Sequence, residues 1–164
     1  MAKKLCIYGI LSAVCLIFSF VEHLVGLDFI APGVKLGLSN SVVLVLIAID
    51  DIKGAFSVNI VRILLSGLLF SSPMAMVFSL AGGITSLIVM SIFSKFKVFS
   101  LYGVSVLGAI THNLAQLFCA WVLLGVGVWF YSPILLISAL VCGILTAFIT
   151  KLICKQLKTY KISK

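Results

Sequence analysis

Six apolar runs, separated by short polar turns, limit this chain to one class of fold. A helix of about 20 apolar residues is long enough to cross the hydrocarbon core of a bilayer. We therefore expect an all-α, polytopic membrane bundle of six transmembrane helices, in a single domain spanning residues 1–164. The runs at 36–49 and 55–70 are shorter than this length. These two runs could therefore form thin, tilted or re-entrant elements instead of full spans. The six runs cover residues 5–21, 36–49, 55–70, 73–93, 98–124 and 128–153.

The composition supports a membrane location and argues against a nucleic-acid-binding protein. The chain is 63% hydrophobic and only 10% charged, whereas a soluble domain is typically about 25% charged. Its net charge is +8, but the basic residues fall mostly in terminal and inter-helix segments without interleaved aromatic residues. They are typical of a topology signal and not of a nucleic-acid surface.

The distribution of lysine predicts the orientation of the bundle. With six spans, ten lysines fall on the side that carries both termini, and only Lys35 falls on the other side. Cytoplasmic loops of membrane proteins are enriched in Lys and Arg. We therefore expect both termini in the cytoplasm, with the chain in the bacterial cytoplasmic membrane. The ten lysines are Lys3, Lys4, Lys53, Lys95, Lys97, Lys151, Lys155, Lys158, Lys161 and Lys164.

An arginine stands in the middle of the third apolar run. A charged side chain near the centre of a bilayer costs about 2.5–3.5 kcal/mol on insertion scales, and such residues mark ligand or ion pathways. Asn59 lies three residues before Arg62 and Ser66 four residues after it, which places all three on one helical face. This polar face predicts a cavity or a partner helix opposite Arg62, with Arg62 as the main contact for an anionic group.

Further polar residues interrupt the fifth run. His112, Asn113 and Gln116 are spaced three and four residues apart, so they cluster on one side of a helix. Buried amide and imidazole groups in lipid need hydrogen-bond partners. Two interpretations stay open: these groups bond neighbouring helices to each other, or they line a ligand cavity together with Arg62 and Asn59.

The segment PGVKLGLSN, before the second helix, places one cation and one amide at the external entrance. These are Lys35 and Asn40. Together, Lys35 and Arg62 would favour an anionic or polar ligand that reaches the cavity from outside. A salt bridge from Lys35 to Asp28 or Glu22 is the competing role. Two other polar signals concern local structure: Asp51 is expected to cap the third helix, and Pro73 suits the first turn of the fourth.

The first run contains Gly9 and Ala13, four residues apart. Small residues at this spacing let another helix approach closely. The pair predicts either internal packing within the bundle or a docking surface for another membrane subunit. Gly82 and Gly83 in the fourth run would likewise admit a neighbouring backbone or a ligand.

No catalytic residue, metal site or cofactor is predicted. The chain has four acidic residues, and Asp50-Asp51 is followed by Ile52, so the D-D-x-x-D motif of prenyl diphosphate synthases is missing. A magnesium-binding role of this carboxylate pair is the minor alternative to capping. The five cysteines stand singly, without metal-ligand spacing. No G-x-x-x-x-G-K-[ST] motif is present, so any ATP-driven step requires a partner.

Four motifs together carry a family resemblance: PGVKLGLSN, IVRILLSGLLF, FSLAGGITSLIVM and GVSVLGAITHNLAQL. The chain resembles the Gx transporter family, which bears the description heptaprenyl diphosphate synthase component I and is similar to S components of energy-coupling factor transporters. This resemblance implies a non-enzymatic membrane protein that captures a small vitamin- or precursor-like molecule. It also implies a coupling transmembrane subunit and ATPases as partners, with docking through small residues of the first helix. The family description implies the alternative, a membrane accessory subunit in polyprenyl diphosphate synthesis.

Overall fold

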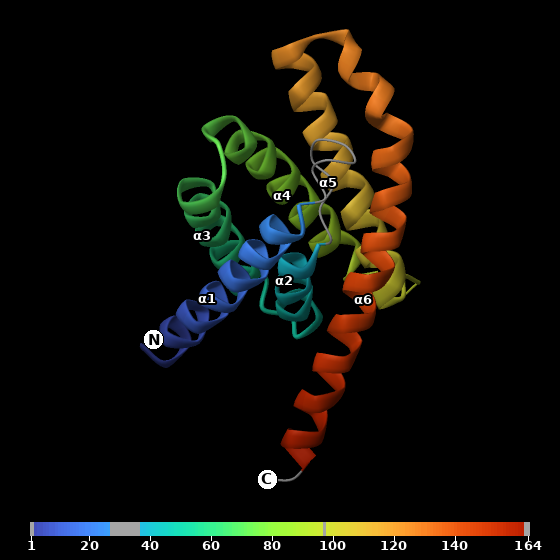
Figure 1. Ribbon diagram of the computed structural model, residues 1–164. Coiled ribbons are helices and arrows are strands. Elements are labelled where there is room, and N and C mark those ends of the chain that lie inside the picture. Colours follow the sequence, from blue (N-terminus) through green and yellow to red (C-terminus); the bar gives the residue numbers. More distant parts are fainter. Residues whose placement is uncertain (1, 27–36, 97, 163–164) are drawn as a thin grey trace.

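The computed structural model describes residues 2–26, 37–96 and 98–162, and this part of the chain is almost entirely helical. Within these described residues the chain forms an all-helical bundle (Figure 1), with six α-helices and one 3₁₀ helix. The elements are α1 (Ala2–Val25), α2 (Leu38–Ala48), α3 (Ile52–Phe70), α4 (Pro73–Phe93), α5 (Leu101–Leu124), η2 (Val126–Tyr131) and α6 (Ser132–Ile162).

Five of these helices are long and apolar enough to cross a membrane, which makes the chain a multi-pass membrane protein. The sixth, α2, has 11 residues. At 1.5 Å per residue this helix is only about 16 Å long, against a hydrocarbon core about 30 Å thick. The sequence predicted a short second run, and the structure gives it a helix that covers only part of the bilayer.

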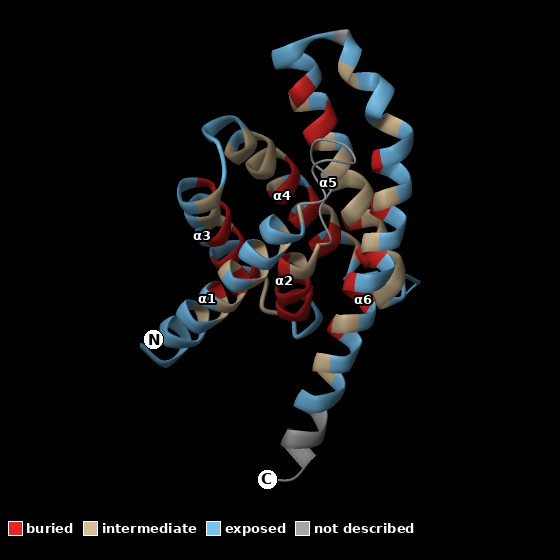
Figure 2. Cartoon of the chain, in the orientation of Figure 1, coloured by how far each residue is buried: buried red, intermediate tan, exposed pale blue. Residues whose placement is uncertain are grey.

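Helix α2 forms the centre of the bundle. It contacts α1, α3, α4 and α6, and its residues are mostly buried (Figure 2). Leu44 and Val43 in α2 are almost fully buried and pack in the main hydrophobic core with Cys15 of α1 and Val58 of α3. A helix that is apolar on all sides is expected in such a buried position, and its central place explains how so short a helix is held.

The other helices surround α2 in an up-and-down order. Along the chain, α3 packs on α1 and α4, α5 packs on α4 and α6, and α6 packs on α2. Both chain termini lie toward the lower side of the view in Figure 1, whereas η2 lies at the top. The sequence analysis placed both termini on the same side of the bundle, in agreement with this view. That this side is cytoplasmic stays a prediction.

Two local signals were predicted correctly. The Asp51 side chain caps α3 by accepting a hydrogen bond from the backbone N–H of Gly54 at 3.1 Å. Pro73 occupies the first turn of α4, and Ser72 before it caps the helix through Ala75 N–H. Both caps satisfy backbone donors that have no partner inside the helix.

Asp51 also connects the turn between α2 and α3 to the first helix. Its carboxylate accepts a hydrogen bond from the Tyr8 hydroxyl of α1 at 2.7 Å. This bond is the main cause that holds the pKa of the Asp51 carboxyl below its ordinary value, although partial burial opposes the shift. The turn is therefore fixed to α1 by a charge-assisted hydrogen bond.

The connection between the last two helices contains a short 3₁₀ helix. Gly125 ends α5 with a left-handed φ of 92°, a conformation that glycine adopts without steric cost. The chain then forms η2 before α6 begins at Ser132, and α6 continues to Ile162. Trp121 of α5 and Trp129 of η2 contact each other here, with ring centroids 6.3 Å apart, as expected of aromatic residues at a membrane interface.

Candidate functional site

Arg62 is buried in the middle of the bundle, with 7% of its surface exposed. From α3, its Nη1 donates a hydrogen bond to Ser39 Oγ of α2 at 2.6 Å, and its Nη2 donates to Asn59 Oδ1 at 2.8 Å. The remaining guanidinium nitrogen, Nε, is buried and has no hydrogen-bond partner among the described residues. The site therefore holds a cation whose Nε–H donor is still available.

Glu22 of α1 supplies the opposite charge. Its Oε2 accepts a hydrogen bond from Ser39 Oγ at 3.3 Å, and its Oε1 accepts from the backbone N–H of Leu38. The carboxylate thus lies at the N-terminus of α2, where the free N–H groups and the helix dipole favour a negative charge. Since Ser39 bonds to both Glu22 and Arg62, the buried guanidinium and the half-buried carboxylate belong to one hydrogen-bonded network.

Asn59, on α3 like Arg62, connects the guanidinium to α4. The Asn59 side chain is 2% exposed, and its Nδ2 donates a hydrogen bond to the Gly83 carbonyl at 3.1 Å. A Cβ atom on Gly83 would lie 3.2 Å from Asn59 Nδ2 and 2.5 Å from the Ile63 side chain. Glycine at this position therefore lets α3 and α4 approach closely enough for the amide of Asn59 to orient the guanidinium.

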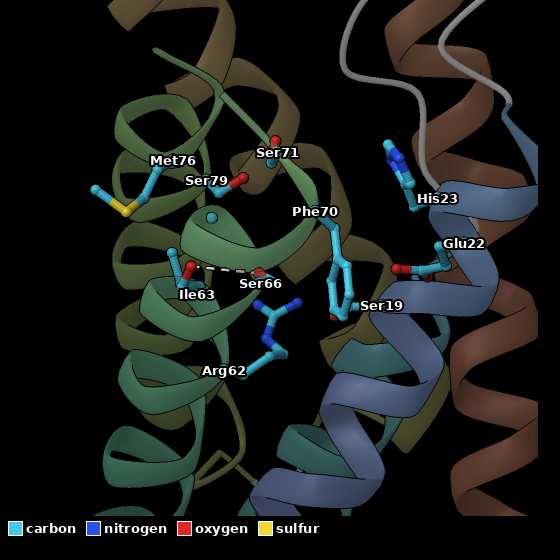
Figure 3. A pocket seen from close by; sticks show the side chains of 11 residues that line it. Ser19, Glu22, His23, Arg62, Ile63, Ser66, Phe70, Ser71, Met76 and Ser79 are labelled. Carbon is cyan, nitrogen blue, oxygen red and sulfur yellow. Dashed lines mark hydrogen bonds between the residues drawn. The ribbon is translucent and has the colours of Figure 1, made fainter. Parts of the chain in front are cut away.

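A first cavity of about 60 Å³ lies beside Arg62, between α1, α3 and α4. Figure 3 shows the guanidinium and the Glu22 carboxylate facing this space from opposite helices, with His23 above Glu22. Phe70 also lines it, and its ring packs on Phe20 of α1 with centroids 5.0 Å apart. Ser66, which was predicted to share a face with Arg62, lines the same cavity.

A second cavity of about 50 Å³ lies on the other side of the charged pair. Arg62, Glu22 and Ser39 line it, so the network faces both spaces. Helices α5 and α6 close it with hydroxyl, amide, imidazole and thiol groups. Its polar lining residues beyond the charged pair are Ser39, Asn40, Ser79, Ser86, Ser105, His112, Asn113, Cys142 and Thr146. We call these two adjoining cavities, which share Glu22, Arg62 and Ser79, the polar chamber.

A third, larger cavity of about 460 Å³ opens between the first turns of α4, the end of α5, η2 and the start of α6. We call it the apolar cavity because hydrocarbon and aromatic groups form most of its lining. Ser79 lines both this cavity and the polar chamber. Its lining residues are Ser71, Ser72, Met74, Ala75, Phe78, Ser79, Gln116, Leu117, Ala120, Leu124, Val128, Tyr131 and Leu135.

The structure brings four of the seven predicted ligand-binding residues to one cavity. Arg62, Asn40, His112 and Asn113 all line the second cavity. Asn113 also donates a hydrogen bond to the Leu135 carbonyl of α6 at 2.7 Å. Asn113 therefore both bonds a neighbouring helix and lines the cavity, as the two interpretations of the polar cluster proposed.

The other three predicted residues lie elsewhere. Asn59 supports Arg62 from behind and is not part of either cavity lining, and Gln116 lines the apolar cavity instead of the polar chamber. Lys35 lies outside the described residues. Sequence reasoning missed Glu22 as a site residue, although an acidic residue in a chain with only four of them is itself a signal of function in a membrane helix.

The predicted docking residues lie on the outer surface. Gly9 and Ala13 are both exposed on α1, and a Cβ on Gly9 would meet no atom within 4 Å. Ile10 and Ile17, 61% and 60% exposed, extend the same surface. Among the described residues, Gly9 and Ala13 are thus not packed inside the bundle, and their role in docking stays a prediction.

Gly82 and Gly83 act as packing notches. A Cβ on Gly82 would lie 2.9 Å from the His112 carbonyl oxygen of α5, and Gly83 faces α3 as described above. Their small size thus lets α4 approach α5 on one side and α3 on the other.

A family model described as heptaprenyl diphosphate synthase component I matches residues 11–153. The match extends from within α1 into α6 and includes Glu22, Ser39, Arg62 and His112. No curated protein and no solved structure matches the chain.

Proposed function

We propose that this chain, which belongs to the heptaprenyl diphosphate synthase component I family, is a membrane-embedded binding protein for a small anionic or polar molecule. In this proposal it is the substrate-binding subunit of an importer of the energy-coupling-factor type. It recognises the substrate and leaves the ATP-driven step to a coupling membrane subunit and ATPases.

The observation that carries the proposal is the buried Arg62 guanidinium beside a polar chamber. Removing one partner of a buried charged pair typically costs about 3–5 kcal/mol, whereas apolar replacements of the whole pair are often neutral. A purely structural bundle therefore gains little from keeping Arg62 and Glu22. An anionic group of a ligand would accept hydrogen bonds from the guanidinium, including the unpartnered Nε, and such charge-assisted bonds are strong in a low-dielectric site.

The chemistry of the lining favours binding over catalysis. Its amide and hydroxyl groups suit the orientation of a polar ligand. The sequence contains neither a D-D-x-x-D motif nor a phosphate-binding G-x-x-x-x-G-K-[ST] loop. Chemistry on a diphosphate or hydrolysis of ATP would accordingly belong to other subunits.

The outer surface of α1 is the proposed docking site for the coupling subunit. Gly9 and Ala13 face outward, and the space above Gly9 is open. Another helix can approach such small residues closely. A Gly9→Leu variant should fold, because Gly9 is exposed and a Cβ there meets no described atom within 4 Å, but it should no longer retain the coupling subunit.

A second candidate function follows from the family description alone. The chain would then be the membrane component of a heptaprenyl diphosphate synthase and would hold a soluble catalytic subunit at the membrane. In that case the function would not require a small molecule to bind in the polar chamber.

One purification experiment separates the two candidates. The full chain is isolated from its own membrane in a mild detergent, and both co-purifying proteins and extracted small molecules are identified by mass spectrometry. A coupling subunit with ATPases, lost in Gly9→Leu and kept in Gly9→Ala, supports the importer. A soluble prenyl diphosphate synthase, together with faster chain elongation on adding the protein, replaces the importer by the accessory subunit.

A further inference from the structure

We infer that the ligand of the polar chamber is an amphiphile, with its polar head at Arg62 and its apolar body in the apolar cavity between α4, α5 and η2. This inference rests on the proposed binding function and specifies the chemical class of the ligand. It concerns the apolar cavity, which none of the network residues Glu22, Ser39 and Arg62 lines.

The sizes of the cavities suit the two parts of such a molecule. The two spaces of the polar chamber measure about 60 and 50 Å³, enough for a few water molecules or one small head group, since a water needs about 10–15 Å³ of such space. The apolar cavity measures about 460 Å³, within the roughly 300–1,000 Å³ of ligand pockets. A wholly polar ligand of the size of the chamber would leave the larger cavity unused.

The two spaces adjoin along α4 and α5. On α4, Ser79 lines the polar chamber and the apolar cavity. On α5, His112 lines the chamber, and Gln116, one turn further along the same helix face, lines the apolar cavity. A single molecule that follows α5 would therefore pass from hydrogen-bonding groups to hydrocarbon groups.

Gln116 provides a separate sign of a ligand at this junction. Its side chain is 7% exposed, and its amide oxygen is buried without a hydrogen-bond partner among the described residues. A buried acceptor without a hydrogen bond destabilises the folded protein. A hydroxyl or N–H group of the bound molecule would satisfy this oxygen where the head of the amphiphile joins its body.

Beyond Gln116 the lining offers mainly apolar contacts. Phe78 and Leu117 come from α4 and α5, and Val128 comes from η2. Each methylene that leaves water for such surroundings strengthens binding by about fourfold, which corresponds to the usual transfer free energy of a CH₂ group. Affinity should therefore increase with the length of an apolar tail attached to a suitable head.

The test uses inorganic phosphate, ethyl phosphate, butyl phosphate and hexyl phosphate as probes. Their binding to the full chain in phosphatidylcholine nanodiscs is measured by calorimetry, and the partitioning into empty nanodiscs is subtracted. The wild-type protein should bind each longer homologue more tightly, by about fourfold per methylene. An affinity that does not change with tail length would overturn the inference.

Two variants fill the apolar cavity without touching Arg62. Ala120→Phe acts from α5 and Ala75→Phe from α4, so the second serves if the first fails to fold. Both should abolish the dependence on tail length and leave the affinity for inorganic phosphate unchanged. Val122→Phe, on the exposed surface of the same helix as Ala120 and outside the cavity lining, is the matched control and should keep the wild-type dependence. An unchanged dependence in a folded cavity-filling variant would show that the tails bind elsewhere, for example among membrane lipids.

The same series separates this inference from the proposed function. If phosphate binds through Arg62 but the tail adds nothing, the polar chamber is a binding site and only the amphiphile is wrong. If no probe binds, or Arg62→Ala binds all of them as the wild type does, the anion-binding function fails together with the inference.

Discussion

Arg62 of α3 and Glu22 of α1 are joined through one hydroxyl group, that of Ser39, which accepts a hydrogen bond from the guanidinium at 2.6 Å and donates one to the carboxylate at 3.3 Å. The link connects the first three helices of the chain, α1, α2 and α3. It also explains how a full positive charge is tolerated inside an apolar bundle, because the opposite charge lies within the same hydrogen-bonded network.

We expect Arg62 and Glu22 to depend on each other for stability. Arg62→Gln and Glu22→Gln should each lower the thermal unfolding temperature, because each removes one charge from the shared network, and Glu22→Gln leaves the buried Arg62 guanidinium without its counter-charge. The double variant should lose less than the sum of the two, with a coupling of about 0.5–3 kcal/mol. Strict additivity in a double-mutant cycle would contradict the shared network.

We expect Gly82 to be required for the contact between α4 and α5. A Cβ there would lie 2.9 Å from the His112 carbonyl oxygen, a backbone atom that moves only if α5 moves. Gly82→Ala should therefore destabilise the protein by about 1–3 kcal/mol.

The matched control for Gly82→Ala is Gly9→Ala in α1. Its new methyl group meets open space, so this variant should be neutral or stabilising by up to about 1 kcal/mol through helix propensity. Equal effects of the two substitutions on thermal unfolding would show that the packing notch at Gly82 is not needed.

We expect the hydrogen bond between Tyr8 and Asp51 to make part of the stability depend on pH. The pKa of the Asp51 carboxyl is lowered in the folded protein, from an ordinary value of about 4. The contribution is therefore complete above about pH 4, and it is lost as the pH falls through the lower, folded-state value. Unfolding temperatures measured from pH 7 to pH 3 should fall less steeply in Asp51→Asn than in the wild type.

Tyr8→Phe serves as the companion to Asp51→Asn, because it removes the main cause of the pKa shift and keeps the carboxyl. Its acid sensitivity should lie between those of the wild type and Asp51→Asn. Identical pH profiles for all three proteins would exclude a stabilising role for this bond.

Local sequence patterns were sufficient to predict much of the fold. Helix spacing placed Asn59 next to Arg62, and the two side chains do bond to each other at 2.8 Å. The caps at Asp51 and Ser72-Pro73 depend on residues close in the sequence. For this reason the Asp51 cap and the position of Pro73 could be predicted. Hydropathy alone identified the spans, since long apolar helices have few alternatives in a bilayer.

The composition of the site could not be predicted in the same way. Glu22 reaches Ser39 only because α1 and α2 pack side by side, and no sequence pattern reports that contact. Gln116 was grouped with His112 by helix spacing, but the packing of α5 against the start of α4 and η2 places it at a different cavity. The central position of α2 is likewise a property of the whole bundle.

The most direct test of the central claim is native mass spectrometry of the full chain, extracted gently from its own membrane. Arg62→Ala is compared with Lys53→Ala, which removes an exposed cation from the same helix. The account predicts one bound small molecule per chain in the wild type and in Lys53→Ala, and none in folded Arg62→Ala. A wild-type spectrum without ligand, or the same ligand bound equally in Arg62→Ala, would contradict the claim that Arg62 forms a binding site.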